Sequence, residues 1–258
     1  MNPSLIFDIS LAQTKPENIR NKEAACPFCD TASLTNILDR SGNIIWLMNK
    51  YPVLKGSWPT VIIESDDCHG EFSAFSNDEA ARILDFSLRH WHETLQRPEF
   101  KSVLFFKNFG PMSGGSLRHP HSQIVGLYDY DYRTDILPAH FEGAILYEDG
   151  DLKLTLSARP LIGFYEFNLI YRPDCSVTNL TLRIRQCLSY IKDYFARAGF
   201  SYNIFFYDLH ADRYYIKIVP RYLSSPLFVG YHISQVCTEE RILQIRNESA
   251  PYFKQDYI

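Results

Sequence analysis

The alternation of apolar and polar residues in the first half of the chain predicts strands around one amphipathic helix. Apolar runs of strand length lie at 43–49, 60–65, 102–107 and 119–126. Between the second and the third run, apolar residues recur every three or four positions, which predicts a helix over 77–96. Ser76 and Glu79 form a capping box at its start, and Pro98 ends it.

The second half repeats this order. A strand-like run at 164–171 precedes a predicted helix over 177–198, which Gly199 ends. The run NIFFYD at 203–208 then resembles VLFFKN at 103–108, and YIKIV at 215–219 resembles HSQIV at 121–125. We therefore expect two tandem units of the α+β class, 1–150 and 151–258, that form a mainly antiparallel sheet flanked by helices. Two unrelated helix–hairpin segments are the alternative.

Composition narrows the class of protein. The chain has 258 residues and is 46% hydrophobic, which is enough to bury a sizeable core. Its net charge is −4 and it has no basic tract, so a nucleic-acid partner is not expected. The first residues lack the pattern of a signal peptide, and no apolar stretch approaches about 20 residues. We expect a cytoplasmic protein without membrane contact.

One segment, NFGPMSGGSLRHPHSQ at 108–123, concentrates the candidate chemistry. Glycines let backbone N–H groups approach an anion closely, and alternate residues of a strand share one face. A phosphate cradle followed by imidazoles on one face suits phosphoryl or nucleotidyl chemistry. The alternative is a Gly/Ser loop before a strand with two incidental histidines. The positions concerned are Asn108, Gly114, Gly115, Ser116, His119, His121 and Gln123.

A second candidate is the pair of cysteines in Cys26-Pro27-Phe28-Cys29. Two thiolates three positions apart can bind one soft cation, and zinc takes four such ligands in a tetrahedron. A redox pair or two ordinary thiols are the alternatives. The other cysteines are scattered, so a disulfide framework is not expected.

The spacing Asn108-x-Gly110-x-x-x-Gly114-x-Ser116-x-x-His119-Pro120-His121-x-Gln123 resembles the active-site signature of galactose-1-phosphate uridylyltransferases. These enzymes are the transferase branch of the histidine-triad superfamily, and they resemble two fused histidine-triad units. The resemblance implies that His121 attacks a nucleotide α-phosphate and forms a covalent nucleotidyl-histidine. The nucleotide then passes from a nucleotide or nucleotide sugar to a phosphorylated acceptor.

The resemblance also implies roles for the neighbouring residues. Ser116 and the amides of Gly114 and Gly115 would hold phosphate oxygens, and Asn108 would orient the loop or contact the substrate. Gln123 replaces the histidine of hydrolytic relatives, and its amide moves no proton at neutral pH, so transfer is favoured over hydrolysis. Asn49, in Asn49-Lys50-Tyr51-Pro52, would contact the ribose or base. The alternative for Asn49 is a turn residue at the end of a strand.

By the same resemblance, a structural zinc ion is implied. Its ligands would be Cys26 and Cys29 together with His69 and His119. Cys68, beside His69, is a competing ligand.

Two departures from the family pattern bear on function. The second half has Arg213 and Tyr215 where the first has its histidine pair. The segment 227–232 resembles a hexose-phosphate loop that crosses a dimer interface, which implies a homodimer. There, Pro226 and His232 replace the family's lysine and glutamate, so the acceptor is not specified.

We therefore expect a nucleotidyltransferase of the uridylyltransferase type. A nucleotide hydrolase, a dinucleoside polyphosphate phosphorylase and a non-catalytic nucleotide-binding protein are the alternatives.

Overall fold

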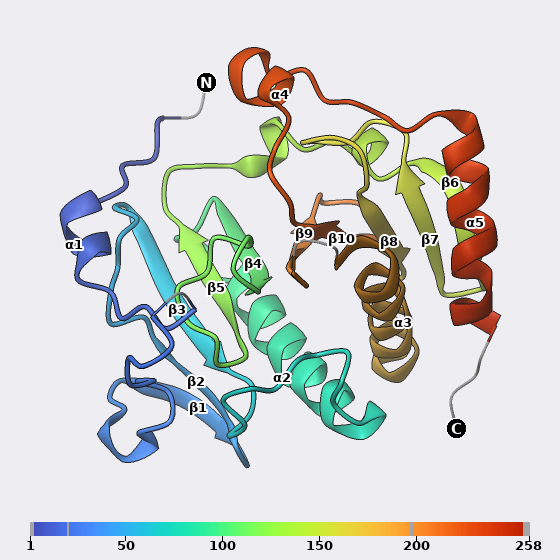
Figure 1. Ribbon diagram of the computed structural model, residues 1–258. Helices are drawn as coiled ribbons and strands as arrows, with labels where there is room; N and C mark the ends of the chain where they lie inside the picture. Colours follow the sequence, from blue (N-terminus) through green and yellow to red (C-terminus); the bar gives the residue numbers. More distant parts are fainter. Residues whose placement is uncertain (1–2, 20, 197–198, 255–258) are drawn as a thin grey trace. The chain divides into compact units, whose positions relative to one another are not determined.

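The computed structural model describes residues 3–19, 21–196 and 199–254 (Figure 1). The chain divides into unit 1, Met1–Thr134, and unit 2, Asp135–Ile258. Each unit is an antiparallel sheet with a long helix between two of its strands, so the α+β class expected from the sequence is confirmed. Among the described residues, no helix combines the length and the apolar character needed to cross a membrane.

Unit 1 forms a sheet in the order β1-β2-β3-β5-β4, in which all neighbouring strands are antiparallel. The single-turn helices α1 (Ile9–Gln13) and η1 (Thr31–Ser33) precede the sheet, and η2 (Tyr132–Thr134) follows it. The sheet and its helix are β1 (Ile37–Ser41), β2 (Ile44–Met48), β3 (Ser57–Ile63), α2 (Asn77–Leu95), β4 (Ser102–Phe109) and β5 (His121–Leu127).

Helix α2 begins where the sequence predicts. The Ser76 side chain accepts a hydrogen bond from the N–H of Glu79, 3.2 Å away, and so satisfies one of the helix's free N–H groups. Its apolar stripe packs against β4 and β5 (Figure 1). Trp91 is fully buried there, and its indole N–H donates to the carbonyl of Val103. One face of the sheet is thus covered by α2.

The opposite face of the unit 1 sheet is covered by the N-terminal segment. Phe28 and Leu34 pack on a buried cluster made of Ile45, Leu47, Val61 and Ile63. His121 pairs with Ile63 and Gln123 pairs with Val61 across the sheet. Because residues paired across two strands share a face, both side chains lie on the face away from α2.

Unit 2 repeats the topology with strand order β6-β7-β8-β10-β9 and a helix between β8 and β9. The expected duplication is therefore confirmed. The unit consists of η3 (Pro138–His140), β6 (Gly143–Glu148), β7 (Leu152–Ser157), β8 (Phe167–Tyr171), α3 (Val177–Phe195), β9 (Tyr202–Asp208), β10 (Tyr214–Pro220), α4 (Pro226–Tyr231) and α5 (Glu239–Lys254). Residues 197–198, at the end of the predicted helix, lie outside the described residues. The stretch 135–150, with β6, belongs to unit 2, whereas the sequence pattern placed the boundary after residue 150.

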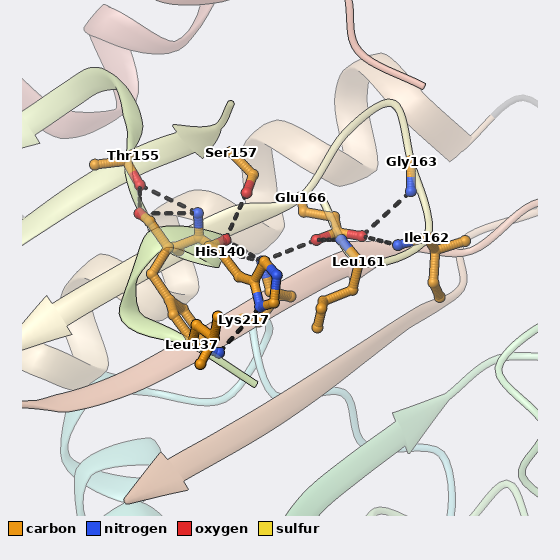
Figure 2. Close-up of polar contacts among 11 residues, drawn as sticks. Leu137, His140, Thr155, Ser157, Leu161, Ile162, Gly163, Glu166 and Lys217 are labelled. Carbon is orange, nitrogen blue, oxygen red and sulfur yellow. Dashed lines mark hydrogen bonds and ion pairs between the residues drawn. The ribbon is translucent and has the colours of Figure 1, made fainter. Parts of the chain in front are cut away.

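A buried ion pair anchors the loops of unit 2 (Figure 2). Lys217 Nζ donates to Glu166 Oε2 at 2.8 Å, to the carbonyl of His140 at 2.9 Å and to Asn168 Oδ1 at 2.7 Å. The Glu166 carboxylate also accepts backbone N–H groups from the loop before β8, those of Leu161, Ile162 and Gly163. All three ammonium hydrogens of Lys217 are therefore used within the fold.

Candidate functional site

The glycine-rich loop between β4 and β5 is held in shape by its own hydrogen bonds. Gly110 and Gly114 have φ angles of 83° and 84°, a left-handed conformation that favours glycine. Ser113 Oγ donates to the carbonyl of Gly110 at 2.7 Å and accepts the N–H of Gly115 at 3.3 Å. The Gly115 amide, expected from the sequence to hold phosphate, is thus engaged inside the loop.

The end of the loop is fixed by Asn18 of the N-terminal segment. The N–H of Asn18 donates to the carbonyl of Ser116 at 3.0 Å, and its Oδ1 accepts the N–H of Arg118 at 2.8 Å. Asn18 is only 6% exposed. Asn18 was not predicted as a site residue, because it lies in a polar segment without a periodic pattern.

The HPH segment, residues 119–121, sets the orientation of two imidazoles. His121 Nδ1 lies 2.8 Å from the carbonyl of His119, which can only accept, so Nδ1 carries the proton and the lone pair lies on Nε2. Burial lowers the pKa of His121 to about 4, although the hydrogen bond to His119 acts the other way. The ring is therefore neutral at pH 7, the state in which its lone pair can attack phosphorus.

A pocket of about 640 Å³ opens on the face of unit 1 away from α2. Leu47 and Val61 form part of its floor, and Asn49 and Ser116 contribute polar groups from distant parts of the chain. The structure thus brings these two predicted residues together. Phe28 also lines the pocket.

The Phe28 ring connects the pocket with the two histidines. Its ring centre lies 5.8 Å from that of His119 and 5.5 Å from that of His121, edge to face in both cases. Gln123 shares the face of His121 and is paired with pocket-lining Val61. The pocket and the HPH segment therefore adjoin, and Phe28 lies between them.

Asn49 helps to shape the backbone of the site, and Asn108 lies against the glycine-rich loop. Asn49 Oδ1 accepts the N–H of Tyr51 at 2.9 Å, so this residue makes a turn after β2 as well as lining the pocket. Asn108 lies near the end of β4, against the glycine-rich loop. A Cβ added to Gly115 would lie 3.4 Å from the Cβ of Asn108.

Three cysteines and one histidine converge beside the HPH segment. The Sγ atoms of Cys26, Cys29 and Cys68 and a ring nitrogen of His119 all lie within 4.8 Å of one another. His119 Nδ1 is 3.6 Å from the sulfurs of both Cys26 and Cys29. On its other side, His119 Nε2 donates to the carbonyl of Ser65 at 2.7 Å, which leaves Nδ1 as the ligand atom.

The geometry of this Cys₃His cluster fits a tetrahedral zinc ion. Zinc lies about 2.3 Å from a thiolate sulfur and about 2.0–2.1 Å from an imidazole nitrogen, so a tetrahedral angle separates the two ligand atoms by about 3.6 Å. Both measured sulfur–nitrogen distances have this value. Four protein ligands leave no position for water, which is typical of a structural site.

His69, expected from the sequence to be the fourth ligand, does not lie in the cluster. The turn after β3 is closed by two side-chain hydrogen bonds, from the N–H of Asp67 to Ser65 Oγ and from the N–H of His69 to Asp67 Oδ1. This turn leaves His69 exposed, with its Nδ1 2.9 Å from Arg118 Nη1, and directs Cys68 to the other ligands. The fourth candidate ligand is thus Cys68, one position before the predicted His69.

Without a metal, Cys26 and His119 shift each other's pKa, the thiol downward and the imidazole upward. Burial alone would raise the pKa of the Cys26 thiol, but the hydrogen bond and charge of His119 help to lower it to about 6. Burial likewise opposes protonation of His119, while Cys26 raises the pKa of its imidazole. Metal binding at this cluster must therefore displace protons.

Comparison with known families covers almost the whole chain. Residues 7–130 match the model of the "Domain of unknown function (DUF4931) N-terminal domain", and residues 133–253 match that of the corresponding C-terminal domain. A solved DUF4931 family protein from Bacillus cereus is 40% identical, with a TM-score of 0.76 over 85% of this chain and 100% of that chain.

Two further proteins are similar to this chain, one in part of its sequence and one in its fold. A galactose-1-phosphate uridylyltransferase from Streptomyces lividans is 28% identical over 111 residues, which is 42% of this chain and 30% of that protein. An ADP-glucose phosphorylase from Arabidopsis thaliana is 16% identical, with a TM-score of 0.72 over 94% of each chain, and shares the fold. The resemblance to galactose-1-phosphate uridylyltransferases that the sequence suggested is confirmed by the first of these matches.

Proposed function

The chain belongs to the DUF4931 family, and we propose that its unit 1 transfers a nucleoside monophosphate through a covalent intermediate on His121. The observation that carries the proposal is the hydrogen bond from His121 Nδ1 to the carbonyl of His119. It leaves Nε2 of a neutral imidazole unprotonated, and the His121 ring packs against Phe28, which lines a pocket large enough for a nucleotide. The nucleotide enzymes among the relatives support the same class of substrate.

The reaction has two displacement steps. His121 Nε2 attacks the α-phosphorus, forms a P–N bond and releases the rest of the donor as a phosphate or sugar phosphate. As the bond forms, positive charge develops on the imidazole. The His119 carbonyl, which accepts the hydrogen bond from Nδ1–H, stabilises this charge. A phosphate oxygen of the acceptor then attacks phosphorus and breaks the P–N bond. Ser116, at the rim of the pocket, supplies a hydroxyl for the phosphate oxygens.

A zinc ion held by Cys26, Cys29, Cys68 and His119 has a structural part in this proposal. Its ligands come from the N-terminal segment, from the turn after β3 and from the residue before Pro120. The ion would supply cross-links between these segments, with no open position for substrate. His119 is thereby held as a ligand while its carbonyl orients His121.

We further propose a homodimer through α4. The resemblance of residues 227–232 to a loop that crosses a dimer interface supports it. Val229 and Tyr231 are 68% and 74% exposed, which suits a surface that a second copy covers.

The proposed function is tested by incubating the zinc-loaded protein with a panel of nucleotide sugars and dinucleoside polyphosphates and weighing the intact protein. A covalent nucleotidyl adduct on wild type that is absent from His121→Ala is expected, and its mass identifies the base. Added imidazole should restore turnover to His121→Gly, because the missing group is a nucleophile. His121→Ala with wild-type turnover would overturn the covalent mechanism. A wild type that binds nucleotides but forms no adduct and shows no turnover would leave the non-catalytic nucleotide-binding protein as the function.

A further inference from the structure

Behind the strand that carries His121, a lysine and a glutamate form a buried ion pair. Glu64 follows β3 and Lys107 lies on β4, and their side chains are 3% and 4% exposed. Lys107 Nζ lies 2.5 Å from Glu64 Oε2. Removing both charges from water is costly, and apolar side chains of similar volume are often as stable in such a place. Stability alone therefore does not explain the pair.

Both members of the pair hold the backbone of the HPH segment. Lys107 Nζ is 3.4 Å from the carbonyl of His121, to which it donates. The N–H of Glu64 donates to the carbonyl of Pro120 at 3.1 Å. The carbonyl of Ser65, the residue after Glu64, accepts a hydrogen bond from His119 Nε2. Each residue from 119 to 121 is therefore hydrogen-bonded to Glu64, Ser65 or Lys107.

The pair acts from the far side of the sheet. Lys107 is paired with Ser122 on β5, and Ser122 lies between His121 and Gln123. Because side chains alternate along a strand, the Lys107 side chain lies on the face toward α2, opposite to the His121 imidazole. A nucleotide in the pocket would therefore not touch Lys107, so the pair would act on the chemistry from behind the strand and not by contact with the substrate.

We propose that Lys107 and Glu64 are positioning residues, which fix the backbone at 119–121 so that His121 Nε2 faces the bound nucleotide. The inference rests on the proposed role of His121. Its ring is oriented by the carbonyl of His119, two residues away, so a shift of this backbone turns the imidazole. A nucleophile misplaced by about 1 Å loses up to about 100-fold in rate.

Unit 2 offers a matched control, the Lys217–Glu166 pair (Figure 2). Its nitrogen–oxygen distance is 2.8 Å, and its side chains are 1% and 0% exposed. It is thus a buried lysine–glutamate pair of the same kind, but in the unit that has Tyr215 in place of a histidine nucleophile.

The experiment compares Lys107→Met/Glu64→Gln with Lys217→Met/Glu166→Gln. For each folded, zinc-loaded protein, the single-turnover rate of adduct formation is measured by intact mass at saturating nucleotide, together with the nucleotide dissociation constant. The first variant should lose up to about 100-fold in rate with an unchanged dissociation constant. The second should keep the wild-type rate. A wild-type rate in the first variant, or equal losses in both, would overturn the proposal.

A spectroscopic measurement separates this inference from the proposed function. If wild type forms no adduct, the proposed function fails, and the ¹⁵N shifts of the His121 ring then decide about positioning. In wild type, the two ring nitrogens should have the well-separated shifts of a single Nδ1–H tautomer. In Lys107→Met/Glu64→Gln, the two shifts should move toward each other, because the ring would exchange between its two tautomers. Unchanged shifts would refute positioning. If this variant does not fold, Lys107→Gln/Glu64→Gln takes its place. It keeps polar groups in the core, but the glutamine side chain is one atom shorter than that of lysine and should not reach the His121 carbonyl, so the same criteria apply.

Discussion

His121 and Gln123 lie two positions apart on the same face of β5, and they differ in whether they can move a proton. Imidazole exchanges protons near neutral pH, whereas a carboxamide only forms hydrogen bonds. A phosphoramidate on His121 would thus lie beside a group that binds oxygen without activating water. Under the proposed mechanism, the two residues would therefore favour a long-lived intermediate that reacts with a phosphorylated acceptor.

Replacing Gln123 by histidine should shift the products from transfer toward hydrolysis. A titratable ring at this position can take a proton from water, and a general base typically contributes about 10²- to 10⁴-fold to a rate. The lifetime of the adduct in buffer without acceptor, followed by intact mass, should therefore shorten by about 100-fold. An adduct as stable as that of wild type would mean that water is excluded by something other than the chemistry of Gln123.

Cys68 and His69 are adjacent, so paired substitutions decide which of them binds the metal. Cys68→Ser should lose stoichiometric zinc, because the substitution removes a ligand. Loss of a hydrogen bond to a ligand already lowers metal affinity by about 10- to 100-fold, so the zinc affinity of this variant should fall by more than that. Its melting temperature should fall as well, since metal binding contributes folding energy. His69→Ala should keep one zinc per chain. Elemental analysis with the opposite result would restore His69 as the ligand.

At the scale of elements, the sequence predicts those that carry a strong local pattern. Helix α2 has an apolar stripe and a cap, and the structure places it at Asn77–Leu95 against a prediction of 77–96. Strand β1 was not predicted. Its residues are mostly exposed, so they show no apolar pattern. The strand is held by contacts with distant residues, such as the hydrogen bond between Asp39 Oδ2 and His90 Nε2 at 2.8 Å, which a local sequence pattern does not predict.

The same contrast applies within the candidate site. The motif around His121 is contiguous in sequence, so spacing alone predicts the alternation that β5 shows. The identity of the fourth metal ligand depends instead on the turn closed by the side chains of Ser65 and Asp67, because this turn determines whether Cys68 or its neighbour His69 points to the cluster. Lys107 and Glu64 appear in the sequence only as single charges at the ends of apolar runs, and their pairing requires three strands to assemble.

The two long helices provide a matched test of capping. Ser76 accepts an N–H at the start of α2, whereas Ser176, at the start of α3, makes no side-chain cap hydrogen bond. Ser76→Ala should therefore lower the free energy of unfolding by about 1 kcal/mol, and Ser176→Ala by much less. Denaturant titration of both variants measures the difference. Equal losses would show that the Ser76 hydrogen bond does not stabilise the helix.

At the scale of the whole molecule, the two units have the same strand topology, but the candidate functional residues lie in unit 1. Unit 1 has the loop, the HPH segment and the Cys₃His cluster, while unit 2 uses Lys217 and Glu166 to close its own core. In unit 2, exposed apolar side chains gather instead on the segment around α4, at Leu223, Leu227, Val229, Tyr231 and Ile233. A surface of this composition is better suited to a partner than to water.

We therefore expect a two-fold homodimer in solution, with Tyr231 and Val229 in its interface. Truncating a central aromatic residue of an interface typically costs about 2 kcal/mol or more, so Tyr231→Asp should raise the dimer dissociation constant at least about 30-fold. Leu243→Asp, at a 57% exposed position of α5, is the control and should remain dimeric. Sedimentation at micromolar concentration measures all three proteins. A wild type that sediments as a 30.0 kDa monomer would contradict the dimer, and a Tyr231→Asp variant as tightly associated as wild type would place the interface elsewhere.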